Sequence, residues 1–112
     1  MEDCKNNIIP IIVSNSYVKK YYLDKRLDTL PNEVKDTLKI LLVRLNDEVG
    51  GVIEVDFDNR DFLLDFRAYK DDNDYNYDDI NANYKLAKLE RENDELFSKV
   101  AEFCKFKLNG LV

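Results

Sequence analysis

The sequence predicts an α+β fold, in which an antiparallel β-hairpin sheet is packed by two main α-helices. Apolar and polar residues alternate over residues 52–69, which is typical of half-buried strands. Apolar residues recur at helical spacing over residues 31–49 and 78–108. The 112 residues are expected to form a single domain (1–112), since this length supports one core. The polar residues 1–7 are expected to be a disordered tail.

The first apolar run, Ile-Ile-Pro-Ile-Ile-Val over residues 8–13, predicts a short strand. Because Pro10 has no N–H to donate, we expect this strand at an edge of the sheet. The cap-type residues Ser14, Asn15 and Ser16 then predict a short helix over residues 16–23.

A longer helix is predicted over residues 31–49, because Pro31 suits a first helical turn and Gly50-Gly51 suits a helix end. One apolar stripe runs along it. Its members are Val34, Leu38, Leu41, Leu42, Leu45 and Val49. Ile40 and Val43 lie off the stripe, so we expect this helix to be buried on more than one side.

The alternation over residues 52–69 predicts a hairpin with a two-residue turn at Asn59-Arg60. That turn pairs Phe57 with Phe62 and places six apolar side chains on one face. They are Ile53, Val55, Phe57, Phe62, Leu64 and Phe66.

The same register places Glu54 opposite Asp65, and Asp56 opposite Leu63, on the outer face. Like charges that face each other destabilise a sheet. Compensation could come from Arg67, from Arg60, from a lysine elsewhere, from a bound cation or from a partner.

The C-terminal helix, predicted over residues 78–108, follows an acidic loop over residues 70–79. Leu86, Leu89, Asn93, Leu96, Val100 and Phe103 follow a heptad seam along it. An asparagine at such a position can fix the register of a coiled coil. We therefore expect either a helix laid on the hairpin or a homodimer through residues 80–108.

The acidic loop resembles the start of a calcium loop, because Asp72, Asp74 and Asn76 have the spacing of its first three ligands. Tyr77 replaces the required glycine, and Asn83 replaces the required glutamate. A divalent-cation site in residues 71–79, or on the hairpin carboxylates, is therefore an alternative rather than the main prediction.

The composition excludes several classes of function. With no histidine, no His-based triad or His-ligated metal site is possible, and no cofactor is expected. A net charge of −6 disfavours binding to nucleic acid or to anionic membranes. The two cysteines, Cys4 and Cys104, and an acidic start at Glu2-Asp3 favour a reduced, cytoplasmic protein. A flat sheet face disfavours the third alternative, a carboxylate-based enzyme, so no catalysis is expected.

The charge is concentrated in one segment: residues 47–79 carry 12 acidic and 3 basic residues, a charge of −9. This distribution favours a small interaction module that presents an acidic hairpin-and-loop surface to a basic protein partner. The candidate surface residues are Glu54, Asp56, Asp65, Asp71, Tyr75, Tyr77 and Asn93.

Several short segments resemble an uncharacterised family of small bacterial proteins. They are Lys20–Leu23, Leu30–Leu41, Glu48–Val52, Tyr77–Ile80 and Glu95–Phe97. The resemblance spans residues 17 to 108 and implies no activity, so it carries over no functional residue. The turn at Asn59-Arg60 departs from that family, where a glycine is expected nearby, and this leaves the length of the hairpin loop open.

Overall fold

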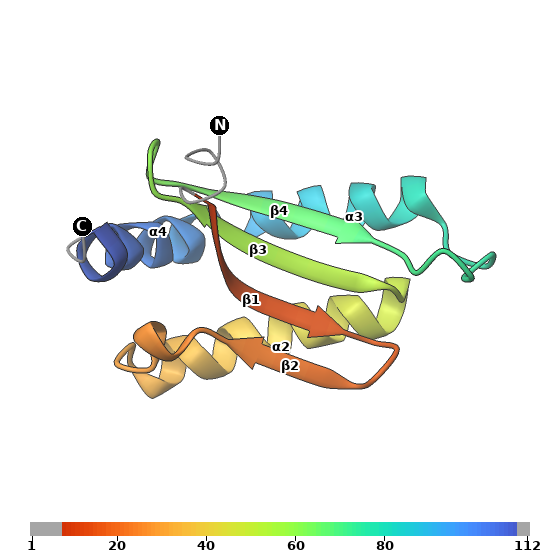
Figure 1. Ribbon diagram of the computed structural model, residues 1–112, viewed down its shortest axis with the longest axis horizontal. Helices are drawn as coiled ribbons and strands as arrows, with labels where there is room; N and C mark the ends of the chain where they lie inside the picture. Colours follow the sequence, from red (N-terminus) through yellow and green to blue (C-terminus); the bar gives the residue numbers. More distant parts are fainter. Residues whose placement is uncertain (1–7, 110–112) are drawn as a thin grey trace.

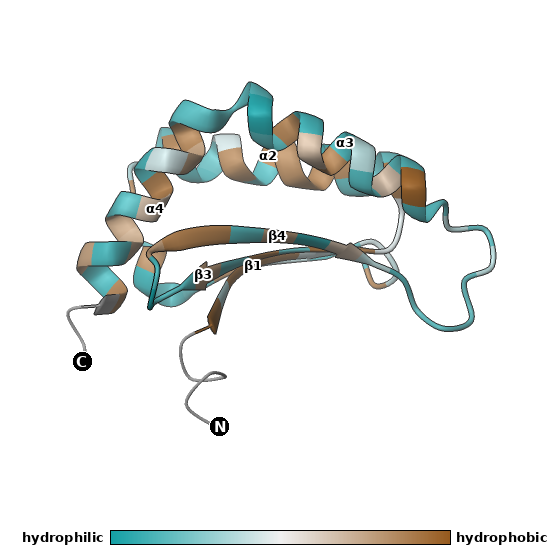
Figure 2. Ribbon diagram, turned by 90° about the horizontal axis from the view of Figure 1, so that it is seen from above, coloured by the Kyte–Doolittle hydropathy of each residue, from teal (hydrophilic) through white to brown (hydrophobic). Residues whose placement is uncertain are grey.

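The computed structural model describes residues 8–109, which form a two-layer α+β fold (Figure 1). A four-stranded antiparallel sheet, in the order β2-β1-β3-β4, forms one layer, and helices α2, α3 and α4 form the other (Figure 2). The strands are β1 (Ile8–Asn15), β2 (Lys20–Leu23), β3 (Val52–Asp58) and β4 (Leu63–Tyr69). The helices are the 3-10 turn η1 (Lys25–Leu27), α2 (Asn32–Val49), α3 (Asp79–Glu92) and α4 (Asp94–Asn109). Among these residues, no helix combines the length and the apolar character that crossing a membrane requires.

The core lies between the sheet and the helices, and the predicted apolar face of the hairpin is confirmed. Ile53, Val55 and Phe57 are buried there, and Phe62, Leu64 and Phe66 pack against them. The stripe of α2 faces the same core through Leu38, Leu42 and Leu45. Ile40, however, is 52% exposed, so the expectation that α2 is buried on more than one side is wrong at this position.

The predicted first strand exists, but its edge position is wrong. β1 lies inside the sheet, between β2 and β3. Pro10 is tolerated there because β2 pairs only with residues 12–15 of β1 and does not reach it. In addition, the register against β3 shifts between Pro10 and Ile12, and such a bulge relaxes the demand for ladder hydrogen bonds.

The predicted helix over residues 16–23 is also wrong. Residues 16–19 form a turn, and residues 20–23 form the edge strand β2. Tyr21 and Tyr22 point to opposite faces of the sheet. Aromatic residues are enriched in strands, which favours β2 over the predicted helix. The turn holds Lys19 at a φ of 56°.

The hairpin turn is four residues long, over 59–62, so the predicted two-residue turn and its register are wrong. The side chain of Asp58 accepts hydrogen bonds from the backbone N–H groups of Arg60 and Asp61, and Phe62 takes a φ of 59°. The pairing therefore shifts by two residues. A shift of two residues leaves each side chain on the same face of its strand. The predicted apolar face was therefore correct although the predicted register was wrong.

The predicted long helix is two helices, because the chain bends at Asn93. Asn93 has φ −122° and ψ 32°, and its side-chain amide donates to the carbonyl oxygen of Leu89 at 2.9 Å. A competing side-chain bond of this kind is favoured at a helix end. The prediction of a continuous heptad seam is therefore wrong. Two of its residues, Leu86 and Val100, are buried in the core of this chain. A homodimer through residues 80–108 stays a prediction.

Candidate functional site

The sheet face that points away from the helices carries the predicted carboxylates. No element among residues 8–109 covers this face, which Figure 1 views from the front. Paired residues of antiparallel strands point to the same side. The register therefore aligns Val13, Glu54 and Arg67 in one row, and Asp56 with Asp65 in the next. Glu54 thus faces Arg67 rather than Asp65, and the like-charge pair is Asp56–Asp65.

Two neighbours on β4 bind the side chain of Glu54. Arg67 Nη2 donates to Glu54 Oε2 at 2.7 Å, and the hydroxyl of Tyr69 donates to Glu54 Oε1 at 2.9 Å. The guanidinium of Arg67 also lies 5.5 Å from the centre of the Tyr69 ring. Burial acts to raise the pKa of Glu54, but the hydrogen bonds from Asp56, Arg67 and Tyr69 outweigh it and lower the pKa.

Asp56 is the least satisfied member of this cluster. It is only 2% exposed, and Arg67 Nε lies 3.2 Å from its Oδ2. From the described residues, no donor reaches its Oδ1. Burial, together with the hydrogen bond and the charge of Glu54, raises the pKa of Asp56 to about 7.

At a pH where two exposed carboxyls would both be ionised, the pair Glu54–Asp56 therefore still holds one proton. A proton held between Asp56 and Glu54 supplies the donor that Oδ1 otherwise lacks. When that proton leaves, two buried negative charges face the single positive charge of Arg67. Chemically, the cluster is a site that prefers one additional positive charge, either a proton or a cation from outside.

Exposed large side chains lie on the same face as the carboxyls of Glu54 and Asp56. Tyr22, Leu63 and Tyr69 are all exposed on the uncovered face, next to the half-exposed Arg67. Exposed tyrosine and arginine around a desolvated centre are typical of protein-binding surfaces.

The acidic loop at the end of β4 is held in place by Tyr17. The hydroxyl of Tyr17 donates to Asp74 Oδ2 at 2.7 Å and accepts from the N–H of Asp71 at 3.0 Å. Asp74 Oδ1 accepts from the N–H of Asn76, so both oxygens of this carboxylate have partners. Among residues 8–109, no three His, Cys, Asp or Glu side chains are grouped so that they could hold a metal ion. The cation alternative, including Asp72, thus gains no support.

We expect Tyr17→Phe to loosen the loop without unfolding the sheet. The change removes both hydrogen bonds to the loop, so it should lower the free energy of unfolding by about 1 kcal/mol. Amide hydrogen exchange over residues 71–76 should become faster while exchange in β3 stays unchanged. The matched control is Tyr75→Phe, since Tyr75 is 87% exposed. Equal exchange in the two variants would contradict the role given to Tyr17.

The remaining predicted surface residues lie apart from the carboxyl cluster. Tyr77 is half-buried, and its ring lies so close to Gly51 that a Cβ there would be 2.7 Å from its Cε1 atom. Asp71 and Tyr75 are exposed in the loop, and Asn93 lies between two helices in the other layer. Neither the loop nor Asn93 therefore shares a site with Glu54.

Sequence reasoning missed Tyr69 and gave Arg67 only as one possible compensator. The signal was present, because both residues follow the period of two that places Asp65 on the outer face. Four cavities formed by residues 8–109 lie elsewhere, and none of these four is lined by Glu54, Asp56 or Asp65. Of the two cysteines, Cys104 is buried in the core, and Cys4 lies outside the described residues.

A comparison with known families finds one match. A family of unknown function, DUF6145, matches residues 8–110, which confirms the expected resemblance to an uncharacterised family. Neither the curated proteins nor the solved structures match the chain. The match assigns no role to any residue.

Proposed function

We propose that this chain, which belongs to the DUF6145 family of unknown function, is a protein-interaction module whose uncovered sheet face binds a partner rich in lysine and arginine. The observation that supports this most is the pair Glu54–Asp56. Its two carboxyls are buried on an uncovered face with one arginine between them. A cation from a partner can replace the proton that the pair otherwise holds.

The electrostatics of the rest of the molecule favour the same kind of partner. The segment over residues 47–79, which includes β3, β4 and the loop, carries a charge of −9. Such a field attracts cationic surfaces from a distance and orients them before contact. Docking also removes water from the exposed Arg67 and Tyr69 beside the buried carboxyls, which strengthens the interaction of the cluster with an incoming charge.

Titration of the carboxyl pair should make binding depend on pH. Below about pH 6 the proton on Asp56 occupies the position that the partner's charge would use. Binding should therefore strengthen as the pH rises from about 6 to 8, and it should weaken with added salt.

An arginine-rich peptide with a fluorescent label tests the proposal. We expect Asp56→Asn to weaken binding of this peptide about tenfold at pH 8, because the buried charge is lost while the shape is kept. The matched control is Asp72→Asn, which removes the same charge from the exposed loop. It should change the affinity by less than about twofold.

Mapping the bound peptide by amide chemical shifts locates the site independently of affinity. We expect the largest shifts at Glu54, Asp56 and Arg67, in the central strands. Two results would contradict the proposal: shifts confined to residues 70–79, or equal loss of affinity in Asp56→Asn and Asp72→Asn.

A further inference from the structure

β4 forms an unprotected edge of the sheet. It pairs with β3 on one side, and among residues 8–109 no strand pairs with its other side. Every second residue of an antiparallel edge strand directs its N–H and C=O groups away from the sheet, and proteins protect such edges by short length, lysine, proline or a bulge. β4 has seven residues without lysine or proline, and its register against β3 contains no shift. The opposite edge strand, β2, has only four residues and begins with Lys20, so β4 is the edge that remains open to pairing.

A cavity of about 150 Å³ lies between β4 and the helices α3 and α4. Leu64 and Phe66 line it from β4, and Phe97 lines it from α4. The rings of Phe66 and Phe97 meet edge to face at 4.8 Å, yet Leu64 and Phe66 are only half-buried. A cavity of this size can accept one ring-sized apolar group. Because paired residues of neighbouring strands point to the same side, a strand added to β4 would direct the side chain opposite Phe66 toward this cavity.

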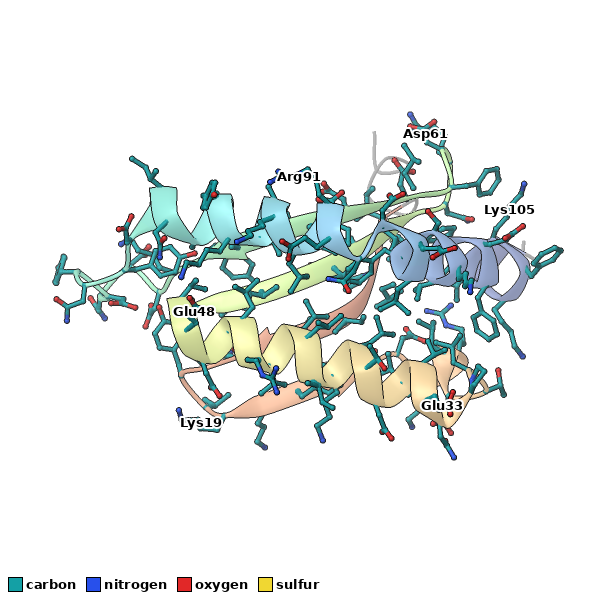
Figure 3. The ribbon with its side chains drawn as sticks, turned by 180° about the vertical axis from the view of Figure 1, so that it is seen from behind. Lys19, Glu33, Glu48, Asp61, Arg91 and Lys105 are labelled. Carbon is teal, nitrogen blue, oxygen red and sulfur yellow. The ribbon has the colours of Figure 1, made fainter. Side chains whose placement is uncertain are left out.

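The charges beside this edge are mostly acidic. Glu90 and Asp94 line the cavity, and Asp65 lies on the outer face of β4. All three are exposed, and none has an ion-pair partner among residues 8–109. Arg67, the basic neighbour on the outer face, is already paired with two carboxylates of β3, and Arg91, which Figure 3 shows on α3 at the margin of the molecule, does not line the cavity. A strand added here would therefore meet carboxylates on both of its faces, which favours lysine and arginine.

The helix layer disfavours a second copy of this chain at the edge. α3 packs mainly on β4, and Figure 1 and Figure 3 show the two elements lying along each other. Two copies paired along β4 would bring their α3 helices to about 4.8 Å, one strand spacing, whereas packed helices need about 8–10 Å. A single extended segment brings no helices with it, so it fits beside β4 where a second copy does not.

We propose that β4 takes up an extended segment of a partner protein as a fifth strand, with one apolar side chain in the cavity and neighbouring lysine or arginine residues beside the carboxylates. In complexes formed by strand addition, main-chain hydrogen bonds provide affinity and alternate side chains provide specificity. The free edge of β4 supplies the first, and the cavity with its acidic surroundings supplies the second. This mode of binding requires neither Glu54 nor Asp56, so it can fail without the proposed binding face, and the reverse.

A peptide with the sequence Thr-Lys-Lys-Phe-Lys-Lys-Thr, blocked at both ends, tests the proposal by amide hydrogen exchange. We expect the bound peptide to slow exchange at every second residue of β4, because only those amides point away from β3, and to leave exchange in β2 unchanged. The same peptide with methylated backbone nitrogens keeps its charges but cannot pair with a strand. It should bind at least about tenfold more weakly.

Variants of the helices locate the peptide at the cavity. Glu90→Gln should weaken binding about threefold, and Ser98→Leu, which fills the cavity, about fivefold. The matched controls are Glu92→Gln and Lys99→Leu, which change exposed residues that do not line this cavity. They should change the affinity by less than about twofold, and so should Asp56→Asn, which tests the binding face.

Three results would overturn the proposal: exchange in β4 that the peptide leaves unchanged, equal binding of the methylated peptide, or equal effects of Ser98→Leu and Lys99→Leu. Slow exchange in β4 that appears without peptide and increases with protein concentration would show that a second copy occupies the edge, and it would also overturn the proposal. None of these results bears on the binding face, whose test is the effect of Asp56→Asn on the arginine-rich peptide.

Discussion

Asp56→Asn is expected to make the protein more stable at alkaline pH, by about 2 kcal/mol near pH 8. Asparagine resembles the protonated form of Asp56 in shape and charge. Its carbonyl oxygen can still accept from Arg67 Nε, and its amide can donate to Glu54. The variant therefore keeps the hydrogen bonds and removes a buried negative charge.

The direction follows from the pKa of Asp56 in the two states. Burial and Glu54 raise it from an ordinary value of 3.8 to about 7 in the folded protein. Between about pH 4 and pH 7 the folded state holds a proton that the unfolded state has released, so stability falls as the pH rises through this window. Glu54 has a lowered pKa and acts in the opposite sense, losing stability as the pH falls through its folded pKa.

Urea denaturation at several pH values measures this effect. The difference between Asp56→Asn and the unmodified protein should be smallest near pH 4 and largest above about pH 7. Asp65→Asn is the matched control, since Asp65 faces Asp56 across the strand pair but is exposed. It should change stability by less than about 0.5 kcal/mol. A destabilised Asp56→Asn at pH 8 would show that the charge of Asp56 serves the fold.

Gly51→Ala should destabilise the protein severely, by about 4 kcal/mol. Gly51 links α2 to β3 at a φ of 69°, which favours glycine. A Cβ there would lie 2.5 Å from the carbonyl oxygen of Tyr69 and 2.7 Å from Cε1 of the Tyr77 ring. Backbone and loop would both have to move, at the place where β4 leads into the acidic loop.

The matched control for this prediction is Gly50→Ala. Gly50 also has a positive φ, 77°, but its added Cβ would meet no atom within 4 Å. It should lose only the conformational part, about 2 kcal/mol. Chemical denaturation compares the two variants. If both variants lose the same free energy of unfolding, the close approach of Tyr69 and Tyr77 to Gly51 does not restrict the residue at position 51.

The fold could be predicted where a pattern repeats over many residues. The period-two run of the hairpin and the apolar stripe of α2 each contain enough residues to identify an element and its buried face. Two predictions on short segments, the edge position of β1 and the helix over residues 16–23, were wrong because local signals compete there. Ser14-Asn15-Ser16 is typical of a helix cap, although Ser14 and Asn15 end β1 and Ser16 begins a turn. Pro10 indicates an edge only where a neighbouring strand would need its N–H.

The candidate site could be predicted only as a set of charges. Alternation placed Glu54, Asp56 and Asp65 on one face, but it did not show that Arg67 and Tyr69 of the neighbouring strand bind Glu54. The predicted hairpin register was wrong by two residues, so the sequence could not show that Arg67 faces Glu54.

The most direct test of the proposed binding face is the titration of Asp56 itself, followed by its carboxyl ¹³C signal with and without the arginine-rich peptide. In the free protein the signal should titrate with a pKa of about 7, because the carboxyl is buried beside Glu54. With the peptide bound, the pKa should fall, because a cation that replaces the proton favours the charged form. A pKa near 4 in the free protein, or one that the bound peptide leaves unchanged, would contradict a role for this carboxyl pair in binding a basic partner.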